Sequence, residues 1–589
     1  MNYSLAKTDI AKEKEKGVLT TAWRRLVPLM GEEKGRVILA LVAILITSAA
    51  ALVVPVMVAH IVDVFLVKKD MNGVMMYAGL LLIIFLVGLA SNYIQIKTMG
   101  GVGRRLLYNL RNKIFNKLQE LPVGFFNQNK VGDLISRINN DTDKLNQFFA
   151  QALMQFLSNI ILIVGTGVLL VVLDWRLGLI ALAPAAVALV ITQLLSGWVK
   201  RTSLLSLRKV GAMSAEVQES INNFKVIVAF SRLDYFRDKF REANDANYKA
   251  AVAAGVAQNV FNPVYSLASS LAQLAVLADG LYLIATGHFT VGLLIGFLLY
   301  VNNFYTPLRQ LASVWPSLQL ALAGLDRISE VLALESDIKT LPAAAPSASP
   351  MARLEFSNVS FHYTDGNEVL KNINFALEAG KTYALVGPTG GGKTTTASLM
   401  ARLYDPTKGA VYLEGRDLRT YEPAERAKRI GFILQDPFLF NGTVRENILY
   451  GNETHQNYTN DELAAVLKAE HLDALLARFS GGLETVITAG GDAVSLGQKQ
   501  LIAFVRATLR NPDILILDEA TANIDTVTEK LLQEIIDKLP KTTTKVIIAH
   551  RLNTIANADE IMFVNAGEVV KAGSMEHAVD LLMHDSRQS

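Results

Sequence analysis

Six long apolar runs within the first 320 residues limit what this chain can fold into. At about 1.5 Å per helical residue, each run is long enough to cross the hydrocarbon core of a bilayer, which is about 30 Å thick. Backbone polar groups have no water to bind there, so helices are the expected structure. Six such runs in series argue against the alternative, buried helices of a large soluble core. The runs cover residues 37–65, 74–95, 149–173, 177–199, 252–286 and 291–315.

Cations are distributed unequally among the segments that join these runs. The turns after the first, third and fifth runs are short and carry only Lys68, Lys69 and Arg176. The long segments after the second and fourth runs are rich in cations: Arg104, Arg105, Arg111, Lys113, Lys117, Lys130, Arg137 and Lys144 in one, and Lys200, Arg201, Arg208, Lys209, Lys225, Arg232, Arg237, Lys239 and Arg241 in the other. The positive-inside rule therefore predicts that the long segments and both termini are cytoplasmic. In the long segments, apolar and charged residues alternate at helical spacing. This spacing predicts that the long segments extend the membrane helices into the cytosol.

Composition agrees with a membrane protein and excludes several other classes. Hydrophobic residues make up 51 % of the 589 residues. The net charge of +3 is small and gives no indication of a nucleic-acid partner. The absence of cysteine excludes disulfides, thiol catalysis and cysteine metal sites. No cleavable signal peptide or transit segment is recognisable, which favours a bacterial plasma membrane over an organelle.

The chain divides into four predicted parts, of which two are large domains. Residues 1–36 form a Lys-rich cytoplasmic leader, in which residues 19–30 are either an interfacial helix or a solvated basic stretch. Residues 37–322 form the transmembrane domain, and 323–350 form a linker that ends rich in Pro, Ala and Ser. From residue 351 to 589, β-rich runs alternate with helical ones. The predicted fold class is an all-α six-helix transmembrane domain followed by an α/β P-loop NTPase domain.

A glycine-rich motif in the second domain predicts a nucleoside triphosphate site. An apolar strand precedes it and a helix-compatible run follows it, which is the setting of a P-loop rather than of a simple tight turn. Its glycines let backbone N–H groups surround phosphate oxygens, Lys393 supplies a cation for the β and γ phosphates, and Thr394 supplies a hydroxyl for Mg²⁺. The motif is Gly387, Pro388, Thr389, Gly390, Gly391, Gly392, Lys393 and Thr394.

Two carboxylates follow another apolar strand, Ile514-Leu515-Ile516-Leu517. We assign Asp518 to Mg²⁺, held through water, and Glu519 to the general base that activates the attacking water. Acidic residues are common in turns, and it is the pairing with the P-loop that gives these two a catalytic interpretation. His550 also ends a β-rich run, but a lone histidine is more often structural.

The order of motifs between residues 354 and 575 resembles the nucleotide-binding domain of ABC transporters. The first 320 residues resemble the six-helix domain of the exporter type, including Gly124-Phe125-Phe126-Asn127 and the run from Gly132 to Arg137. The resemblance implies that Tyr363 stacks on adenine, that Gln435 ligates Mg²⁺ and senses the membrane domain, and that His550 contacts the γ-phosphate. It further implies nucleotide contacts from Thr395 after the P-loop, from the signature residues Ser495, Gly497 and Gln498, and from Asp525 of the D-loop.

That resemblance also implies a dimer. In the family each ATP lies between the P-loop of one nucleotide-binding domain and the signature of another, and this chain has one of each. ATP binding would favour an outward-facing state and hydrolysis would reset it. The turns near residues 140–146 and 218–225 are expected to carry the motion to the membrane domain.

The chain departs from the family pattern at its signature. Leu496 replaces the first glycine of the usual Leu-Ser-Gly-Gly-Gln, at a place where backbone and phosphate approach closely. Residues 488–491 lack the acidic residue that exporters usually carry there. Since Lys393, Asp518 and Glu519 are intact, the pattern resembles the subunit of a heterodimeric exporter that supplies the active P-loop. A homodimer that tolerates one substitution is the alternative.

The substrate is predicted only by class. Asp279, Asn302, Asn303 and Phe304 are candidates for the translocation path, and Asp279 either faces the bundle interior or lies near the outer interface. We expect an ATP-driven exporter of amphipathic, especially cationic, drugs or of lipids, with a second half-transporter chain, membrane lipid and a small molecule as partners. A homodimeric lipid or peptide exporter is one alternative. A membrane ATPase that regulates a channel or partner without pumping is an alternative of another class.

Overall fold

In this computed structural model the chain forms two compact units. The sheet unit contains Met1–Ser4, Glu120–Lys130 and Leu334–Ser589, and the helical unit contains Leu5–Gln119 and Val131–Ala333. The described residues are 3–5, 28, 31, 33–342, 352–364, 366–470, 472–488, 494–518, 526–548, 557–572 and 577. The expected leader helix at residues 19–30 lies outside them, apart from Pro28.

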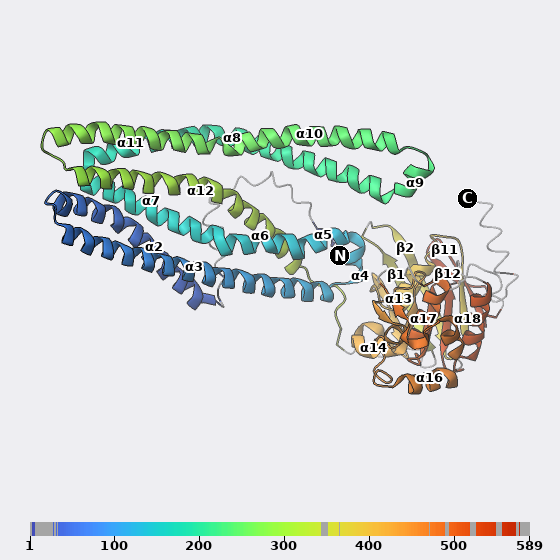
Figure 1. Ribbon diagram of the computed structural model, residues 1–589. Helices are drawn as coiled ribbons and strands as arrows, with labels where there is room; N and C mark the ends of the chain where they lie inside the picture. Colours follow the sequence, from blue (N-terminus) through green and yellow to red (C-terminus); the bar gives the residue numbers. More distant parts are fainter. Residues whose placement is uncertain are drawn as a thin grey trace. The chain divides into compact units, whose positions relative to one another are not determined.

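The helical unit consists of long helices in series (Figure 1). Among the described residues, six helical spans are long and apolar enough to cross a membrane, as the six apolar runs predict. The elements are α2 (Lys34–His60), η2 (Ile61–Leu66), α3 (Met71–Glu120), α5 (Val131–Ser136), η3 (Arg137–Asp141), α6 (Thr142–Gln147), η4 (Phe148–Ala152), α7 (Leu153–Leu173), α8 (Trp175–Asn222), α9 (Phe224–Ala229), α10 (Leu233–Asn259), α11 (Phe261–Ala285) and α12 (Val291–Leu332).

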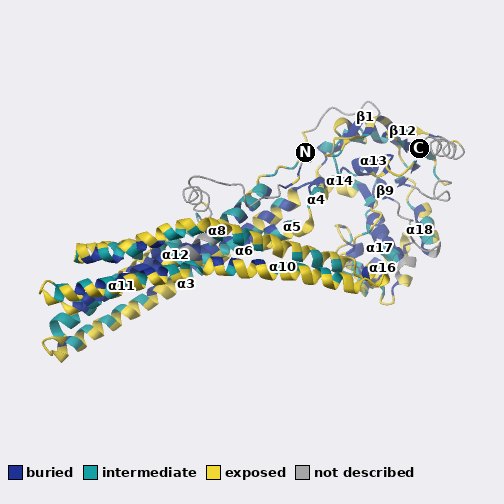
Figure 2. Ribbon diagram, turned by 90° about the horizontal axis from the view of Figure 1, so that it is seen from above, coloured by how far each residue is buried: buried dark blue, intermediate teal, exposed yellow. Residues whose placement is uncertain are grey.

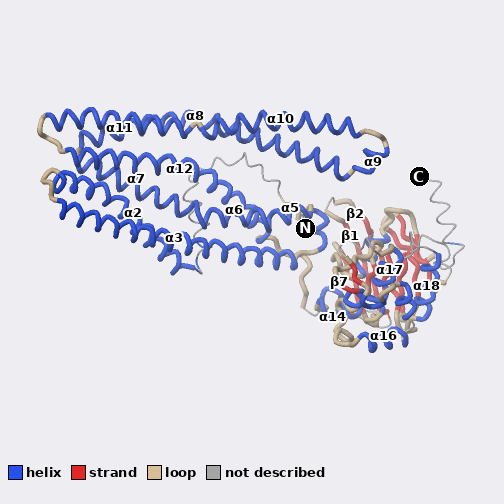
Figure 3. The backbone as a smooth tube through the Cα atoms, viewed as in Figure 1, coloured by secondary structure: helices blue, strands red, loops and turns tan. Residues whose placement is uncertain are grey.

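The cation-rich segments continue the membrane helices, as their spacing predicts. Helix α3 runs for 50 residues and α8 for 48 without interruption. Helices α8 and α10 lie side by side, and short α9 joins their ends (Figures 1 and 3). Buried residues gather between α7, α8, α11 and α12, where Tyr265, Phe297 and Tyr300 are among the most enclosed side chains. The outward faces are exposed (Figure 2) and carry large apolar side chains, as a lipid-facing surface requires.

An ionic cluster joins α5 and η3 to α12. Arg137 of η3 is only 2 % exposed. Its guanidinium donates to Asp133 of α5 at 3.0 Å and to Glu330 of α12 at 2.7 Å. Arg327 of α12 pairs with Asp133 at 2.6 Å and with the fully buried Asp141 at 3.2 Å. Because each buried charge has a partner, the cluster holds the two helices in one register.

In the part of the sheet unit that the structure describes, the strands form a six-stranded sheet, a four-stranded antiparallel sheet and a two-stranded ribbon. The order of the six-stranded sheet is β12-β11-β3-β10-β9-β6, and β11, β3, β10, β9 and β6 are parallel. The strands are β1 (Ala352–His362), β2 (Glu368–Glu378), β3 (Thr382–Val386), β4 (Lys408–Leu413), β5 (Arg416–Asp417), β6 (Ile430–Ile433), β7 (Gly442–Thr443), β8 (Val486–Ile487), β9 (Ile514–Asp518), β10 (Thr544–Ile548), β11 (Glu560–Asn565) and β12 (Glu568–Lys571).

Among the described residues of the sheet unit, one large apolar core lies between the sheets and another among the helices that follow β6, and a smaller cluster lies along β3 and β11. The helices are α4 (Val123–Gln128), α13 (Lys393–Met400), η5 (Leu418–Thr420), α14 (Pro423–Arg429), α15 (Val444–Ile448), α16 (Asn460–Ala469), η6 (Asp473–Arg478), η7 (Gly482–Glu484), α17 (Leu496–Thr508) and α18 (Thr526–Lys538).

The structure corrects one expectation. We expected a turn near residues 140–146, but these residues are helical: they lie in η3 and α6, and both elements pack against α12. The segment that shares a compact unit with the sheets is Glu120–Lys130, which contains α4. The sequence did not distinguish the two because both are short amphipathic stretches between the same pair of apolar runs.

Candidate nucleotide site

The P-loop, Asp518 and Gln435 lie at or just after the ends of strands of the six-stranded sheet. The P-loop follows β3, Asp518 ends β9, and Gln435 lies two residues beyond β6. Because β3, β10, β9 and β6 are adjacent parallel strands, their carboxyl ends meet at the same edge, where ligands of such sheets bind. The Oγ1 of Thr394 donates to the Oδ1 of Asp518 across 3.4 Å, which joins two of these strand ends directly.

Glycines let the P-loop pass close to β11. A Cβ on Gly387 would lie 2.0 Å from the carbonyl oxygen of Val564, and one on Gly391 would lie 2.6 Å from the same atom. Gly387 also has a φ of 149°. No other residue fits these two positions without moving the strand, so the loop's path depends on glycine.

Lys393 starts α13 and is 5 % exposed. Its Nζ donates to the carbonyl oxygens of Gly387 at 2.8 Å and Pro388 at 2.9 Å, so the side chain folds back over the loop that precedes it. A cation and the start of a helix converge here, after a glycine-rich loop. Each favours an anion, and together they suit a phosphate group.

The donor set beside this cradle fits Mg²⁺. Thr394 offers a hydroxyl and Asp518 a carboxylate that is 5 % exposed, and both are the oxygen ligands that this ion prefers. Mg²⁺ usually takes only one or two protein ligands and fills its shell with water and phosphate oxygens. Gln435, which is exposed beyond β6, is a third oxygen donor at the same sheet edge.

Tyr363 lies beside the P-loop helix. Its hydroxyl and the Oγ1 of Thr395 are 3.0 Å apart, and its ring packs edge to face on Tyr404 with centroids 5.3 Å apart. Asn127 of α4 donates to the Tyr404 hydroxyl at 2.7 Å, and Gln128 donates to Thr364 at 2.9 Å. Burial raises the pKa of Tyr404, so this phenol stays protonated.

Sequence reasoning missed the role of Tyr404 and of Asn127. Asn127 belongs to the Gly-Phe-Phe-Asn motif, but the motif does not indicate its partner, 277 residues away. The aromatic residues Tyr363 and Tyr404 stand apart in sequence, with no periodic pattern to join them. Only the tertiary fold brings their rings together.

The signature residues form the start of α17. Ser495 caps the helix: its Oγ accepts from the N–H of Gln498 at 3.2 Å, and its own N–H donates to the Gln498 side chain at 2.9 Å. Gln498 also donates to the carbonyl of Arg478 at 2.6 Å. Leu496 is half-buried and packs against the helical core, and Gly497 is buried. Leu496 therefore turns part of its side chain inward rather than standing wholly over the helix N-terminus.

Three predicted site residues lie outside the described residues: Glu519, Asp525 and His550. The stretch that lacks the acidic residue is likewise described only at Thr488. In sequence, Glu519 directly follows the end of β9, and His550 comes two residues after β10.

The candidate path residues lie in α11 and α12. Asn302 is exposed, and Asn303 is half-buried and donates to the carbonyl of Ala51 at 3.2 Å. Asp279 is half-buried on α11. Phe304 is 8 % exposed and belongs to the core of the helical unit, so packing already accounts for its side chain.

Membrane-length helices joined to a P-loop, with a carboxylate at a neighbouring strand end, define a membrane-bound P-loop ATPase. The model of the ABC transporter transmembrane region matches residues 37–308, and that of the ABC transporter family matches 370–522. The chain belongs to the ABC transporter family, and it is a half-transporter with both domains in one chain.

Relatives agree over nearly the full length. The uncharacterised ABC transporter ATP-binding protein YfiC of Bacillus subtilis is 34 % identical over 97 % of this chain and 93 % of its own. A fatty acid ABC transporter ATP-binding/permease protein of Mycobacterium bovis is 32 % identical over 86 % and 79 %. A multidrug resistance ABC transporter ATP-binding and permease protein of Lactococcus lactis subsp. cremoris is 30 % identical over 96 % and 95 %.

Membership of the family carries several conclusions. The chain is a multi-pass membrane protein that binds ATP and couples its hydrolysis to transport. It is an exporter of the multidrug or lipid type. As a half-transporter it works as a dimer, either with a second copy or with another chain.

Proposed function

We propose that this chain is the catalytic-site half of a heterodimeric exporter of amphipathic, preferentially cationic, drugs or of lipids. This chain contributes a P-loop half-site to one ATP and a signature half-site to another. The observation that carries the proposal is that the P-loop half-site is intact whereas the signature is altered. Lys393, Thr394 and Asp518 converge at the sheet edge, whereas Leu496 replaces glycine at the start of α17. The substrate class rests on the relatives named for multidrug resistance and fatty acid transport.

At the intact half-site, the residues of this chain hold and orient ATP. Lys393 exchanges the carbonyls of Gly387 and Pro388 for β- and γ-phosphate oxygens, because a charged oxygen is a stronger partner than a carbonyl. Thr394 and Gln435 would hold Mg²⁺, with Asp518 bound through water, and the ion would neutralise charge on the phosphates. Glu519 accepts the proton of the attacking water, and His550 donates to the γ-phosphate. Tyr363 stacks on adenine while Thr395 fixes its hydroxyl.

The other half-site offers a signature with Leu496. A helix N-terminus binds phosphate through free N–H groups, and glycine lets the phosphate approach them closely. Leucine adds a Cβ at the first helical position, even though its tip packs inward on the helical core. We therefore expect ATP opposite this signature to turn over more slowly than ATP at the intact P-loop.

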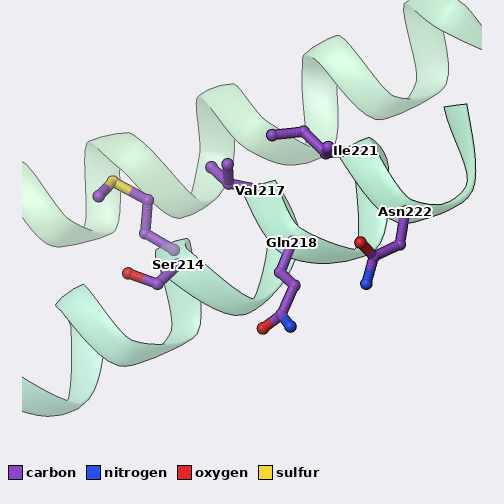
Figure 4. A pocket seen from close by; sticks show the side chains of 6 residues that line it. Ser214, Val217, Gln218, Ile221 and Asn222 are labelled. Carbon is purple, nitrogen blue, oxygen red and sulfur yellow. The ribbon is translucent and has the colours of Figure 1, made fainter. Parts of the chain in front are cut away.

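Two apolar surfaces support docking between chains. Helix α9 exposes Phe224, Val226 and Val228, and Phe230 beyond it is 75 % exposed. A hollow of about 510 Å³ lies just before α9; Ser214, Gln218 and Asn222 point out of α8 there, while Val217 and Ile221 lie between α8 and the neighbouring helix (Figure 4).

The sheet unit has a groove of about 230 Å³ after β6, where Leu434, Phe438, Phe440 and Tyr450 are exposed. Arg506 supports the groove wall by donating to the carbonyls of Asn447 at 2.7 Å and Phe438 at 3.0 Å. Exposed apolar patches of this kind mark interaction sites. We propose that α9 of one chain docks in the groove of its partner and transmits closure of the ATP sites.

We place the chain in a bacterial plasma membrane with the ATPase domain on the cytoplasmic side, because the helix extensions carry the excess of cations. Asn302 on α12 and Asp279 on α11 are the proposed polar positions of the translocation path. An acidic group there would attract a cationic substrate.

Cross-linking separates the heterodimer from a homodimer. The chain has no cysteine, so an engineered cysteine is the only one in each copy. A Val226→Cys version and a Phe440→Cys version with different tags can therefore be co-expressed, and any disulfide between the two tagged copies forms between the engineered positions. A heterodimer predicts that the two tags do not cross-link and that a different chain co-purifies. Efficient cross-linking between the tags, with full ATPase activity of the chain alone, would contradict the heterodimer and leave the exporter assignment intact.

A further inference from the structure

Tyr3 is buried in the sheet unit although its chain neighbour Ser4 is exposed. The Tyr3 side chain is 3 % exposed and packs edge to face on Phe125 of α4, with ring centroids 6.3 Å apart. Phe125 itself is fully buried. The Tyr3 ring is therefore enclosed through a contact with α4, which lies far away in sequence.

Main-chain atoms of Tyr3 bind the end of α4. The Tyr3 N–H donates to Oε1 of Gln128 at 2.7 Å, and the Tyr3 carbonyl accepts from Nδ2 of Asn129 at 2.9 Å. Asn129 also donates to the carbonyl of Phe125 at 2.8 Å, which closes the C-terminal end of α4. The segment around Tyr3 therefore fixes both the position and the end of this helix.

The Tyr3 hydroxyl binds a different part of the chain. It accepts from the N–H of Asp337 at 2.9 Å and donates to the carbonyl of Glu335 at 3.3 Å. Burial raises the pKa of the phenol, so it stays protonated and can donate. Residues 335–337 follow α12 by a few positions, and the same stretch is bound further along, where Arg402 donates to the carbonyl of Lys339 at 2.8 Å.

Tyr3 thus joins two of the places where the chain passes from the helical unit to the sheet unit. One is the segment from Glu120 to Lys130, which α3 and α5 flank, and the other is the stretch after α12. From α4 the contacts continue to the adenine side of the site: Asn127 donates to Tyr404, Tyr404 packs on Tyr363, and Gln128 donates to Thr364.

We propose that Tyr3 is a positioning residue that locks α4 and the stretch after α12 to the ATPase domain, so that both connections move together when the nucleotide state changes. Tyr3 does not touch ATP; it acts through α4 and through Tyr404. The transport consequence rests on the proposed function, whereas the locking of α4 does not.

Hydrogen exchange by mass spectrometry on the full chain tests the lock without any substrate. Tyr3→Ala removes the ring and should speed amide exchange across 120–130 and 335–337 by about tenfold. Tyr3→Phe keeps the ring and the main-chain bonds but removes both hydrogen bonds of the hydroxyl. It should therefore speed exchange at 335–337 by at least about fivefold and leave 120–130 protected. Tyr248→Ala, at a tyrosine that is 65 % exposed on α10, is the matched control and should change neither segment.

Function supplies the second readout, with rhodamine 6G, a cationic amphipathic dye, as the probe in proteoliposomes. Tyr3→Ala should retain ATP hydrolysis, raise the KM for ATP about threefold, and lower dye moved per ATP about tenfold, since hydrolysis continues while its link to the helices is loosened. Unchanged exchange over 120–130 in Tyr3→Ala would overturn the proposal. If Tyr3→Ala does not fold, equal exchange at 335–337 in Tyr3→Phe and the natural chain overturns it. Wild-type protein that moves no dye would count against the proposed substrate, and the exchange result would still decide the role of Tyr3.

Discussion

Thr394 and Asp518 form a hydrogen bond of 3.4 Å although 124 residues separate them in sequence. Strand order explains the contact, because only β10 lies between β3 and β9 and all three are parallel. The order of the strands therefore brings the P-loop hydroxyl and the strand-end carboxylate together. This pairing places the Mg²⁺ ligands of the proposed site.

Changing the carboxylate tests this pair. Asp518→Asn keeps the size of the side chain and removes its charge, so the Mg²⁺ concentration that gives half-maximal ATPase activity should rise at least about tenfold. Asp461→Asn, an exposed carboxylate in the first turn of α16, is the matched control and should leave the Mg²⁺ dependence unchanged. The same Mg²⁺ titration for both variants would contradict the assignment of Asp518.

If Tyr363 stacks on adenine, its loss should change the KM for ATP and leave kcat nearly unchanged. Tyr363→Ala should raise the KM for ATP about tenfold with kcat within about twofold, since stacking on a base contributes about 1–3 kcal/mol. Tyr363→Phe keeps the ring and loses only the bond to Thr395, so it should restore most of the affinity. A loss of kcat at unchanged KM in Tyr363→Ala would argue for a structural role instead.

The buried ionic cluster predicts a large effect on stability. Arg137→Met leaves Glu330 and Asp133 without this partner, which should cost about 3–5 kcal/mol and lower the thermal midpoint of the purified chain. Arg241→Met breaks the exposed pair with Asp238 and should cost less than about 1 kcal/mol. Equal midpoints for the two variants, measured in the same detergent, would be incompatible with a stabilising cluster.

A second ionic cluster gives the sheet unit a dependence on pH. Burial alone would raise the pKa of Glu414, but Arg429 and Arg353 outweigh it and hold the pKa below its ordinary value of 4.5. The pairing therefore stabilises the fold above pH 4.5, and this contribution is lost as the pH falls through the lower folded-state pKa. Glu414→Gln should lower the melting temperature at pH 7, with a gap that narrows only below pH 4.5. A gap that stays constant down to pH 3.5 would show that the charge is not responsible.

Substitution of Leu496 is expected to raise ATPase activity rather than lower it. If the signature of this chain serves the slower ATP site, Leu496→Gly should roughly double ATPase activity of the dimer, because a second site begins to turn over. Leu496→Ala is the control, since it shortens the side chain without restoring glycine. An unchanged rate in Leu496→Gly would mean that this position does not limit the second site.

Local patterns predicted the elements, and tertiary packing decided the contacts between them. The six apolar runs and the P-loop are recognisable because length, hydropathy and glycine spacing act over a few residues. The placement of α4 in the sheet unit, the contact of Asn127 with Tyr404 and the burial of Tyr3 depend on residues hundreds of positions apart. The inward packing of Leu496 depends likewise on a core that the signature motif does not describe. The predicted roles of Glu519, Asp525 and His550 stay predictions.

Flux in proteoliposomes tests the central claim most directly. The chain, purified with whatever partner accompanies it, should accumulate rhodamine 6G or a fluorescent phospholipid in an ATP-dependent manner. Glu519→Gln should abolish that accumulation, because the water at the γ-phosphate loses its base while ATP still binds. Steady ATP hydrolysis by the natural protein with no movement of any probe in such a panel would contradict export and favour an ATPase that regulates a partner.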